Sequence, residues 1–389
     1  MSLAQIIAAE SICASGLNSE IIFKNAIDGR CSQSNGLNAI STEIWLDLKD
    51  RTPLELQKSK STILSYQPLK DVLEKTEWTN EELRDCGFIF ATTTSEIDIW
   101  ENQIPFFNNE KIQSPRKNIV SHQSLGIIIE DLRSFFNIQG PCSVLSSSCS
   151  ASLQALALAS AWIKMGKVKR CIVGSTEILS TLTTSGFESL RLISRQNCKP
   201  FDKNRSGINL GEASAFIALE KESRESKKAL AFMSGFGLSS DAYHSTSPQP
   251  EGSGSEQAIK KALQQSQIEA SEISWFYAHG TGSLANDLSE ARAIERLFPK
   301  GVFVSSTKSI HGHTLACSGL LESVLSIQSL KNQMAIPNST YETADPAFKL
   351  NLTQRPEKNE LNHILKNSLG FGGINCSLII SRNSRHADI

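Results

Sequence analysis

The uncharged segment 134–163 restricts the fold of this chain more than any other feature of its sequence. It contains many serines, and its purely apolar part is too short to cross about 30 Å of hydrocarbon, so no membrane span is expected. The segment instead predicts a buried strand that leads into a buried, alanine-rich helix at 150–164. Apolar strands that alternate with helices are typical of α/β proteins, in which helices cover both faces of mostly parallel sheets.

The overall composition excludes several classes of partner. Of the 389 residues, 40% are hydrophobic and 20% are charged, and the net charge is −1. This balance gives no reason to expect nucleic acid or an anionic membrane as a partner. The nine cysteines are scattered and form no C-x-x-C pair, and the N-terminus lacks the basic segment of a signal peptide. A reducing, cytoplasmic location is therefore expected.

The chain also divides in sequence into two halves with one order of elements. The segment 245–255 contains two prolines and two glycines, and it predicts a boundary between residues 1–245 and 246–389. Three pairs of segments share the order of strand, small-residue turn and helix: 86–94 with 275–283, 143–147 with 302–306, and 170–175 with 375–381. The shared order predicts a duplicated fold.

Cys149 is the candidate nucleophile. It lies in the sequence SSSCSAS, between the predicted strand and the helix at 150–164, and thus at or near the N-terminus of that helix. The free N–H groups and the dipole of a helix N-terminus favour a thiolate, and the same N–H groups can hold an oxyanion. The alternative interpretation is a small, buried core cysteine.

Two further motifs carry histidines in the second half. His279 begins the sequence HGTGSLAND directly after the strand 275–278, and Lys308 and His313 lie in the glycine-containing loop 305–319. An exposed turn and a solvated loop are the alternative interpretations. His311 and His313 form an H-x-H pair, but no third ligand of fitting type lies nearby in sequence, so no metal site is expected.

The glycine-rich segment 367–375, NSLGFGGIN, leads into the last predicted strand. It is not a Walker loop, and no G-x-G-x-x-G follows a strand, so phosphate binding is not expected here. The glycines instead allow the backbone to approach a ligand closely, with Phe371 as a side chain that is free to swing.

In this order and spacing, the motifs resemble those of the elongating β-ketoacyl-[acyl-carrier-protein] synthases of the thiolase superfamily. The matching positions are Cys149, the block PFD at 200–202 with Arg205 and Gly211-Glu212, HGTGS at 279–283 with Asp287, STKS at 306–309 with Gly312-His313, NSLGFGG at 367–373, and Glu322 on the helix that follows His313. Leu369 replaces an aromatic residue of the family, and the segment 23–83 matches poorly. These departures favour a specialised acyl or polyene pathway over routine fatty-acid synthesis.

The resemblance implies a thiolase-like fold, with two pseudo-symmetric halves in a layered α/β/α/β/α sandwich, and a decarboxylative Claisen condensation. Cys149 would take an acyl group from a carrier protein, and the carbanion left by decarboxylation of a malonyl thioester would attack it. The implied roles are oxyanion donation by the N–H groups of Cys149 and Phe371, enolate stabilisation by His279 and His313, an ion pair between Lys308 and Glu322, phosphopantetheine binding by Thr281 and Ser283, and acyl gating by Phe371. No permanently bound cofactor is implied, because the phosphopantetheine arm comes with the acyl carrier protein.

The resemblance also implies partners and rival functions. Acyl carrier protein is the expected partner, together with a second subunit in a homodimer or in a heterodimer with a chain-length-factor-like protein. Carrier proteins are acidic, so the predicted docking residues are Arg116, Lys117, Lys203 and Arg205. A non-catalytic chain-length factor is the main alternative, although such proteins normally lack the nucleophile. A degradative thiolase would need a second catalytic cysteine, for which Cys376 is the only candidate late in the chain. The initiating synthases use one histidine and one asparagine, so the two histidines here argue against that class.

Overall fold

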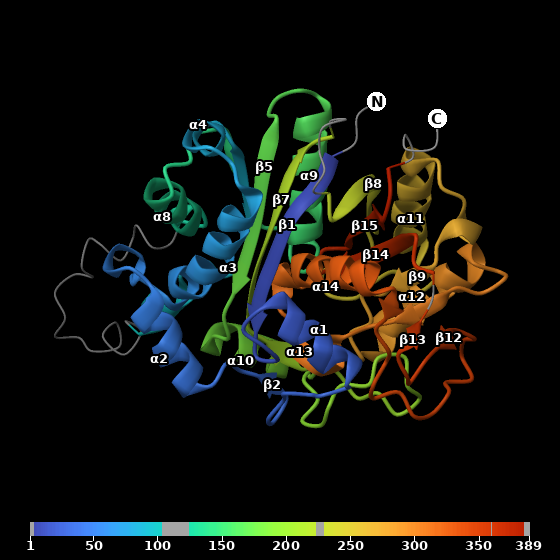
Figure 1. The fold of residues 1–389 in the computed structure, drawn as a ribbon. Helices are drawn as coiled ribbons and strands as arrows, with labels where there is room; N and C mark the ends of the chain where they lie inside the picture. Colours follow the sequence, from blue (N-terminus) through green and yellow to red (C-terminus); the bar gives the residue numbers. More distant parts are fainter. Residues whose placement is uncertain (1–3, 103–123, 223–228, 359, 385–389) are drawn as a thin grey trace.

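The computed structural model describes residues 4–102, 124–222, 229–358 and 360–384 (Figure 1). Within them, eleven strands form one large sheet: β1 (Ala4–Cys13), β3 (Gly87–Ala91), β4 (Cys142–Leu145), β5 (Arg170–Glu177), β7 (Ala213–Lys221), β8 (Ala231–Ser240), β9 (Trp275–Tyr277), β10 (Phe303–Ser305), β12 (Asn351–Leu352), β14 (His363–Gly370) and β15 (Ile374–Ser381). Two small ladders pair β2 (Leu37–Asn38) with β6 (Leu210–Gly211) and β11 (Met334–Ala335) with β13 (Glu357–Lys358).

The described α-helices alternate with the strands along most of the chain. They are α1 (Ser19–Ile27), α2 (Thr42–Arg51), α3 (Lys60–Thr76), α4 (Asn80–Arg84), α5 (Ile97–Glu101), α8 (Ile127–Phe135), α9 (Ala151–Lys164), α10 (Thr181–Ser189), α11 (Ser253–Ser266), α12 (Leu284–Leu297), α13 (Lys308–His311) and α14 (Ser318–Asn332). No helix among the described residues is both long enough and apolar enough to pass through a lipid bilayer.

Ten of the eleven strands of the large sheet form two sets of five with the same connectivity, and β12 is added beyond β10. From the middle of the sheet outwards, one set runs β1-β7-β5-β3-β4 and the other runs β8-β15-β14-β9-β10. In both sets the second strand from the middle, β7 or β15, is antiparallel to its two neighbours, and the strands beyond it are parallel. The two sets join where β1 pairs with β8. This topology confirms a duplicated α/β fold.

One pair of the predicted repeat is wrong. The sequence paired 170–175 with 375–381, but β5 occupies the same place in its set as β14, whereas β15 corresponds to β7. The second set also begins with β8, ahead of the turn-rich segment at 245–255, which connects β8 to α11. Short apolar strands look alike in sequence whichever direction they run, so only the pairing of the sheet reveals which strands are equivalent.

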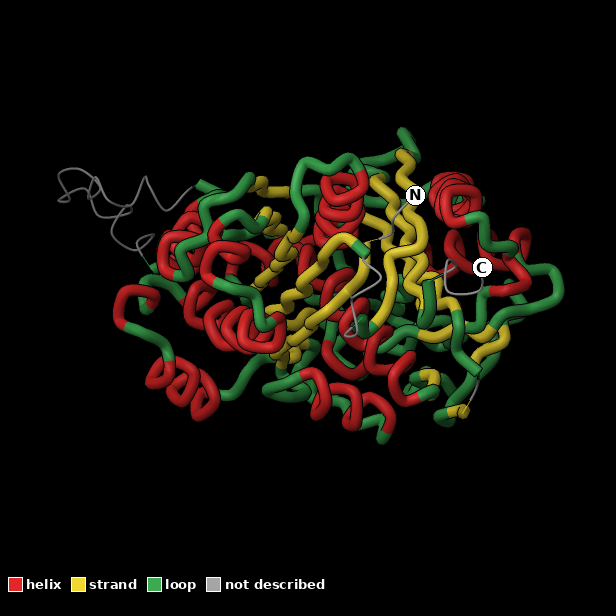
Figure 2. Tube along the Cα trace, turned by 45° about the horizontal axis from the view of Figure 1, so that its top comes forward, coloured by secondary structure: helices red, strands yellow, loops and turns green. Residues whose placement is uncertain are grey.

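The helices lie in three layers around the two strand sets (Figures 1 and 2). The central layer holds α9 and α14, which pack against each other and against strands of both sets. Gly319 allows this contact, since a Cβ atom there would lie 2.6 Å from Leu153 Cδ1 of α9. On the outer faces, α3 and α8 cover the first set and α11 and α12 cover the second. The uncharged segment therefore forms β4 and a central helix. The helix is buried, as its composition predicts. The prediction of a buried strand is wrong, because β4 lies at the edge of the sheet that the described residues form, with Cys142 exposed and its other residues partly exposed.

Candidate active site

Cys149 lies on a tight turn between β4 and α9. Ser148, the residue before it, has a left-handed backbone with φ of 53°. Few residues other than glycine adopt this conformation readily. Ser150 then occupies the N-cap position of α9, and the Cys149 carbonyl accepts a hydrogen bond of 3.0 Å from Ser368 Oγ of β14. The turn presents the sulfur to a cavity of about 300 Å³.

The electrostatics of this thiol differ from the sequence-based expectation. The side chain is 5% exposed, and burial raises the pKa of Cys149 to about 12, although Lys308 acts in the opposite direction. The predicted thiolate at the helix N-terminus is therefore wrong, because loss of hydration outweighs the favourable local groups. The N–H groups of Phe371 and Cys149 both hydrogen-bond the sulfur, and both lower its pKa. The two predicted oxyanion donors thus point at the atom that would carry the acyl group.

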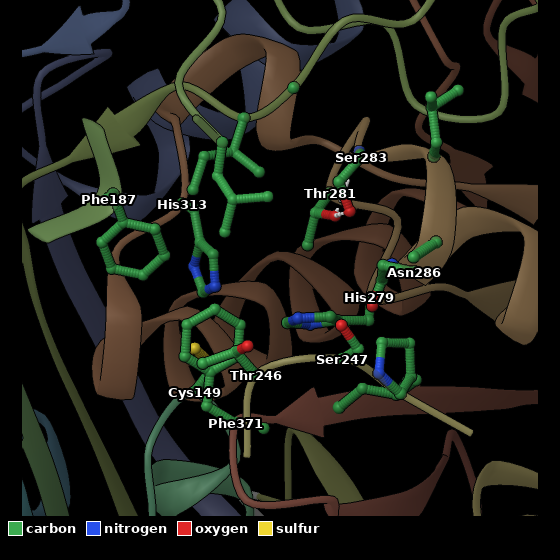
Figure 3. Close-up of a pocket in the computed structure, with 18 of the residues that line it drawn as sticks. Cys149, Phe187, Thr246, Ser247, His279, Thr281, Ser283, Asn286, His313 and Phe371 are labelled. Atoms are coloured by element: carbon green, nitrogen blue, oxygen red, sulfur yellow. Dashed lines mark hydrogen bonds between the residues drawn. The ribbon is translucent and has the colours of Figure 1, made fainter. Parts of the chain in front are cut away.

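Two histidines face the same cavity (Figure 3). The rings of His279 and His313 lie edge to face, with centroids 5.3 Å apart. His279 follows β9, and Glu290 of α12 holds its backbone N–H at 2.8 Å. The Nδ1 atom of His313 accepts the N–H of Leu315 at 3.2 Å, so its proton resides on Nε2.

Both imidazoles are neutral. Burial and then Lys308 lower the pKa of His313 to about 3, and the same two causes hold the pKa of His279 well below its usual range. A neutral imidazole donates one N–H and carries no charge. The pair therefore suits the stabilisation of a developing oxyanion and cannot supply a proton as an imidazolium at neutral pH.

Behind the histidines lies a buried ionic cluster. Lys308 Nζ contacts Glu322 Oε1 at 2.6 Å, as the family resemblance implied, and Lys366 Nζ of β14 contacts Glu322 Oε2 at 2.7 Å. Burial alone would raise the pKa of Glu322, but the two ammonium groups lower it to about 2. Sequence reasoning missed Lys366, although a single lysine inside the apolar strand 363–370 is a signal that could have found it.

Phe371 separates the first cavity from a second one. The second cavity has a volume of about 450 Å³ and is also lined by Cys149 and Phe371. Thr93 and several residues of α10, among them Leu182, form other parts of its wall. The ring of Phe371 stacks on Phe187 of α10 at 5.5 Å between centroids. Gly372, which follows it, has φ of +84°, and a Cβ atom added there would meet no atom closer than 3.9 Å, so the segment has room to move. Phe371 therefore lies where movement of its ring would open or close a passage between the two cavities.

The remaining predicted binding residues line the first cavity. Thr281 Oγ1 and Ser283 Oγ lie 3.0 Å apart, and both residues face Cys149 across the cavity (Figure 3). Asp287 of α12 fixes this loop, because its carboxylate accepts the N–H groups of Thr281 and Gly282. The hydroxyl pair is therefore held in place while remaining open to a ligand.

The predicted docking residues have different environments. Arg116 and Lys117 lie outside the described residues, and Lys203 is exposed. Arg205 is wrong as a docking residue: its side chain is 3% exposed and pairs with Asp345 at 2.5 Å and with Asp287 at 3.9 Å, so it connects α12 to the loop that contains Asp345. Sequence reasoning also missed Arg191, an exposed residue at the mouth of the first cavity.

Cys376 does not fit the role of a second catalytic thiol. It is fully buried in β15, it is not among the described residues that line either cavity, and burial raises its pKa far above the usual range. The described residues also contain no cluster of three His, Cys, Asp or Glu side chains that could hold a metal ion.

Comparisons with known proteins agree with this site. Residues 56–225 match the family described as Beta-ketoacyl synthase, N-terminal domain, and residues 230–342 match Beta-ketoacyl synthase, C-terminal domain. A 3-oxoacyl-[acyl-carrier-protein] synthase 2 of Vibrio cholerae is 31% identical over 356 residues, which cover 87% of this chain and 86% of that protein. A protein of the same name from Coxiella burnetii is 33% identical over 261 residues, or 64% of this chain and 63% of that protein.

Solved structures show the same fold. A chain from a ketosynthase in complex with its chain length factor, from Xenorhabdus doucetiae, has a TM-score of 0.83 at 28% identity and covers 98% of each chain. A beta-ketoacyl synthase from Burkholderia phymatum has a TM-score of 0.87 at 23% identity and covers 99% of this chain and 100% of that chain. The predicted layered fold of two similar halves is thereby confirmed.

Proposed function

This chain belongs to the β-ketoacyl synthase family, and we propose that it elongates a carrier-bound acyl chain by decarboxylative Claisen condensation on Cys149. One observation carries the proposal: a buried thiol, two neutral histidines and two converging backbone N–H groups share one cavity, while a second cavity opens on the other side of Phe371. The cavity that holds the histidines receives the pantetheine-bound substrates, and the second cavity receives the acyl chain.

The first half-reaction transfers the acyl group to Cys149. The sulfur attacks the carbonyl carbon of the acyl thioester, and the bond from that carbon to the carrier sulfur breaks. The thiol proton leaves with the carrier thiol, so the step needs no other reagent. The N–H groups of Cys149 and Phe371 stabilise the oxyanion of the tetrahedral intermediate, and the loss of one such donor typically costs about 10²–10³ in rate.

The second half-reaction uses the histidines. A malonyl thioester loses CO₂, and the electron pair of the broken C–C bond forms an enolate whose oxygen accepts N–H bonds from His279 and His313. The enolate carbon then attacks the acyl carbon on Cys149. The cysteine leaves as a thiolate and takes a proton from solvent, which restores the resting thiol. Thr281 and Ser283 hold the amides of the pantetheine arm.

The partners follow from the same site. Acyl carrier protein supplies the phosphopantetheine arm. Arg191, which lines the first cavity, gives its acidic surface a basic target, and the exposed Lys203 is a second candidate. Within the described residues, β4 has β3 as its only neighbour in the sheet, and its residue Cys142 is exposed. A sheet edge of this kind is a template for pairing. A second copy paired at β4 would lie beside the second cavity, and a chain-length-factor-like subunit is the other candidate for that position.

Two observations bear on pathway and location. Leu182 and Leu190, which line the second cavity, are 64% and 46% exposed, so a second subunit would complete the wall of the acyl site. The neighbour from Xenorhabdus doucetiae was solved with such a subunit, which supports a specialised pathway over routine fatty-acid synthesis. All nine cysteines are free thiols, in keeping with a cytoplasmic enzyme.

The histidine variants test the function. His279→Ala and His313→Ala should still accept an acyl group on Cys149, seen as the mass increase of the intact protein after incubation with acyl carrier protein. Both should lose condensation by about 10²–10³, the scale for one lost oxyanion donor. Cys149→Ala is the control, and it should show no mass increase. A wild-type protein that never becomes acylated would instead support the chain-length-factor alternative.

A further inference from the structure

Lys366 is a buried cation that the reaction described above does not use. It lies in the middle of β14, its side chain is fully buried, and its cross-strand neighbour is Leu378 of β15. A lysine is almost never fully buried unless it has a partner. Its position in an apolar strand therefore needs a reason beyond packing.

The ammonium group connects three parts of the site. It contacts Glu322 Oε2 at 2.7 Å, and it donates to the carbonyl of Asn367 at 2.5 Å and to that of Ala278 at 3.2 Å. It also donates to the carbonyl of Tyr277 at 3.4 Å, so its three N–H donors go to three backbone carbonyls, and Glu322 is held as an ion pair. A neutral amine has one donor fewer and no charge, so it could not keep all three hydrogen bonds and would lose the ion pair with Glu322.

Each acceptor belongs to a segment that carries a catalytic group. Ala278 directly precedes His279. Asn367 directly precedes Ser368, whose hydroxyl donates to the Cys149 carbonyl at 3.0 Å. Glu322 holds Lys308 through its other carboxylate oxygen at 2.6 Å. Lys366 is thus one hydrogen-bonding centre between the histidine loop, the nucleophile and the ionic cluster.

The charge of this centre depends on its surroundings. Burial lowers the pKa of Lys366 to about 8, against the attraction of Glu322 and with repulsion from Lys308. The titratable groups that face it from the packed elements are Glu322, Lys308, Glu290, Tyr277, His279, His311, His313 and Cys376. The three histidines are neutral and Glu322 stays ionised at neutral pH, so Lys366 is the member whose charge changes near pH 8.

We propose that Lys366 is a positioning residue of the condensation step, which holds His279 and the Glu322–Lys308 pair in register with Cys149 through its hydrogen bonds to backbone carbonyls and its ion pair with Glu322. This inference rests on the proposed function. It predicts that the two half-reactions respond differently to loss of the ammonium group. The oxyanion donors of acylation are backbone N–H groups of Cys149 and Phe371, which Lys366 does not contact, whereas enolate stabilisation depends on the placement of His279.

The test compares Lys366→Met with Lys366→Gln and with a packing control. Methionine is unbranched and only one atom shorter than lysine, and it removes all three donors. Glutamine restores two donors without the charge. Leu378→Val removes one methylene from the neighbouring strand position and leaves the ionic cluster intact. For each protein, single-turnover acylation of Cys149 and the rate of condensation with malonyl carrier protein are measured from about pH 6 to about pH 9.5, a range that brackets the pKa of Lys366.

The expected result is a separation of the two rates. Lys366→Met should acylate within about threefold of wild type and condense about 10–10² times more slowly, the scale of a misplacement near 1 Å, and Lys366→Gln should recover part of that loss. In wild type, condensation should fall above about pH 8 and acylation should not, and this fall should be absent from Lys366→Met. Leu378→Val should change both rates equally.

Two results would overturn the inference. One is a Lys366→Met enzyme that condenses at the wild-type rate or that loses both half-reactions to the same extent. The other, which needs no variant and so applies even when Lys366→Met does not fold, is a wild-type condensation rate with no fall between about pH 7 and about pH 9.5. A wild-type protein that performs neither half-reaction would refute the proposed function itself.

Discussion

Replacement of Glu322 by glutamine tests the energetics of the buried ionic cluster. The carboxylate is fully buried between two ammonium groups, at 2.6 Å from Lys308 Nζ and 2.7 Å from Lys366 Nζ. Glutamine has nearly the same shape, so packing is preserved. Its amide oxygen can accept from one lysine only, and its NH₂ group, which is a donor, then faces the other ammonium group.

The size of the stability loss follows from the removal of the anion that contacts both buried cations. Removal of one partner from a buried ion pair costs about 3–5 kcal/mol, because the remaining charge stays buried without compensation. This is a large share of a total stability of about 5–15 kcal/mol. The pKa of Glu322 in the folded state, about 2, lies below its usual value of 4.5. The stabilisation is therefore complete above pH 4.5 and is lost as the pH falls through about 2.

Urea unfolding of Glu322→Gln at neutral pH, followed by circular dichroism, measures the loss. The double variant Glu322→Gln with Lys366→Met supplies the control, since it removes one of the two unpaired cations. It should be more stable than the sum of the single losses predicts, by about 0.5–3 kcal/mol. A single variant within about 1 kcal/mol of wild type, or two losses that simply add, would refute the argument that Glu322 serves as counter-ion to both lysines.

Three further predictions concern the thiol, the ring of Phe371 and the mouth of the cavity. The rate at which iodoacetamide alkylates Cys149 should keep rising with pH from neutral to about 9, because a pKa of about 12 leaves the thiol largely protonated throughout. A rate that reaches a plateau below about pH 8, measured by peptide mapping, would reveal a stabilised thiolate. Phe371→Ala should slow transacylation, measured as the rate of mass increase, with little loss of stability, because the ring is only partly buried; destabilisation by about 3–5 kcal/mol with unchanged kinetics would make the ring a core residue. Arg191→Glu should raise the KM for acyl carrier protein and leave turnover of a small pantetheine thioester unchanged, because rim charges act mainly on association; equal loss with both substrates would point to damage of the cavity.

Much of the fold could be predicted from local sequence. The uncharged segment 134–163 indicated a strand and a buried helix. The helix is buried as expected, whereas β4 is partly exposed, because the absence of charge does not reveal which strand lies at the edge of the sheet. The order of elements indicated duplication. The order of elements gave the wrong partner for the segment 170–175, because β5 and β15 are similar apolar strands that differ in direction. The direction of a strand is set by its pairing with neighbouring strands of the sheet.

The sequence by itself also determined the identity of the chemical groups. Cys149, His279, Lys308 and His313 stand out because each follows a predicted strand at a turn of small residues, and in parallel strands such ends meet at one edge of the sheet. Their order along the chain was enough to indicate the family and its reaction. These properties depend on residue type and spacing, which a sequence records directly.

Only the tertiary structure decided the electrostatics. A helix N-terminus predicted a thiolate at Cys149, whereas burial keeps the thiol protonated, and burial is set by residues distant in the chain. The sequence predicted Arg205 to be a surface charge, whereas in the structure it is buried and paired with Asp345 and Asp287. Lys366 had no visible partner in sequence, because Glu322 reaches it from another element, 44 positions away along the chain. Charge, burial and proton affinity depend on distances in space, and these distances exist only once the two halves have closed around α9 and α14.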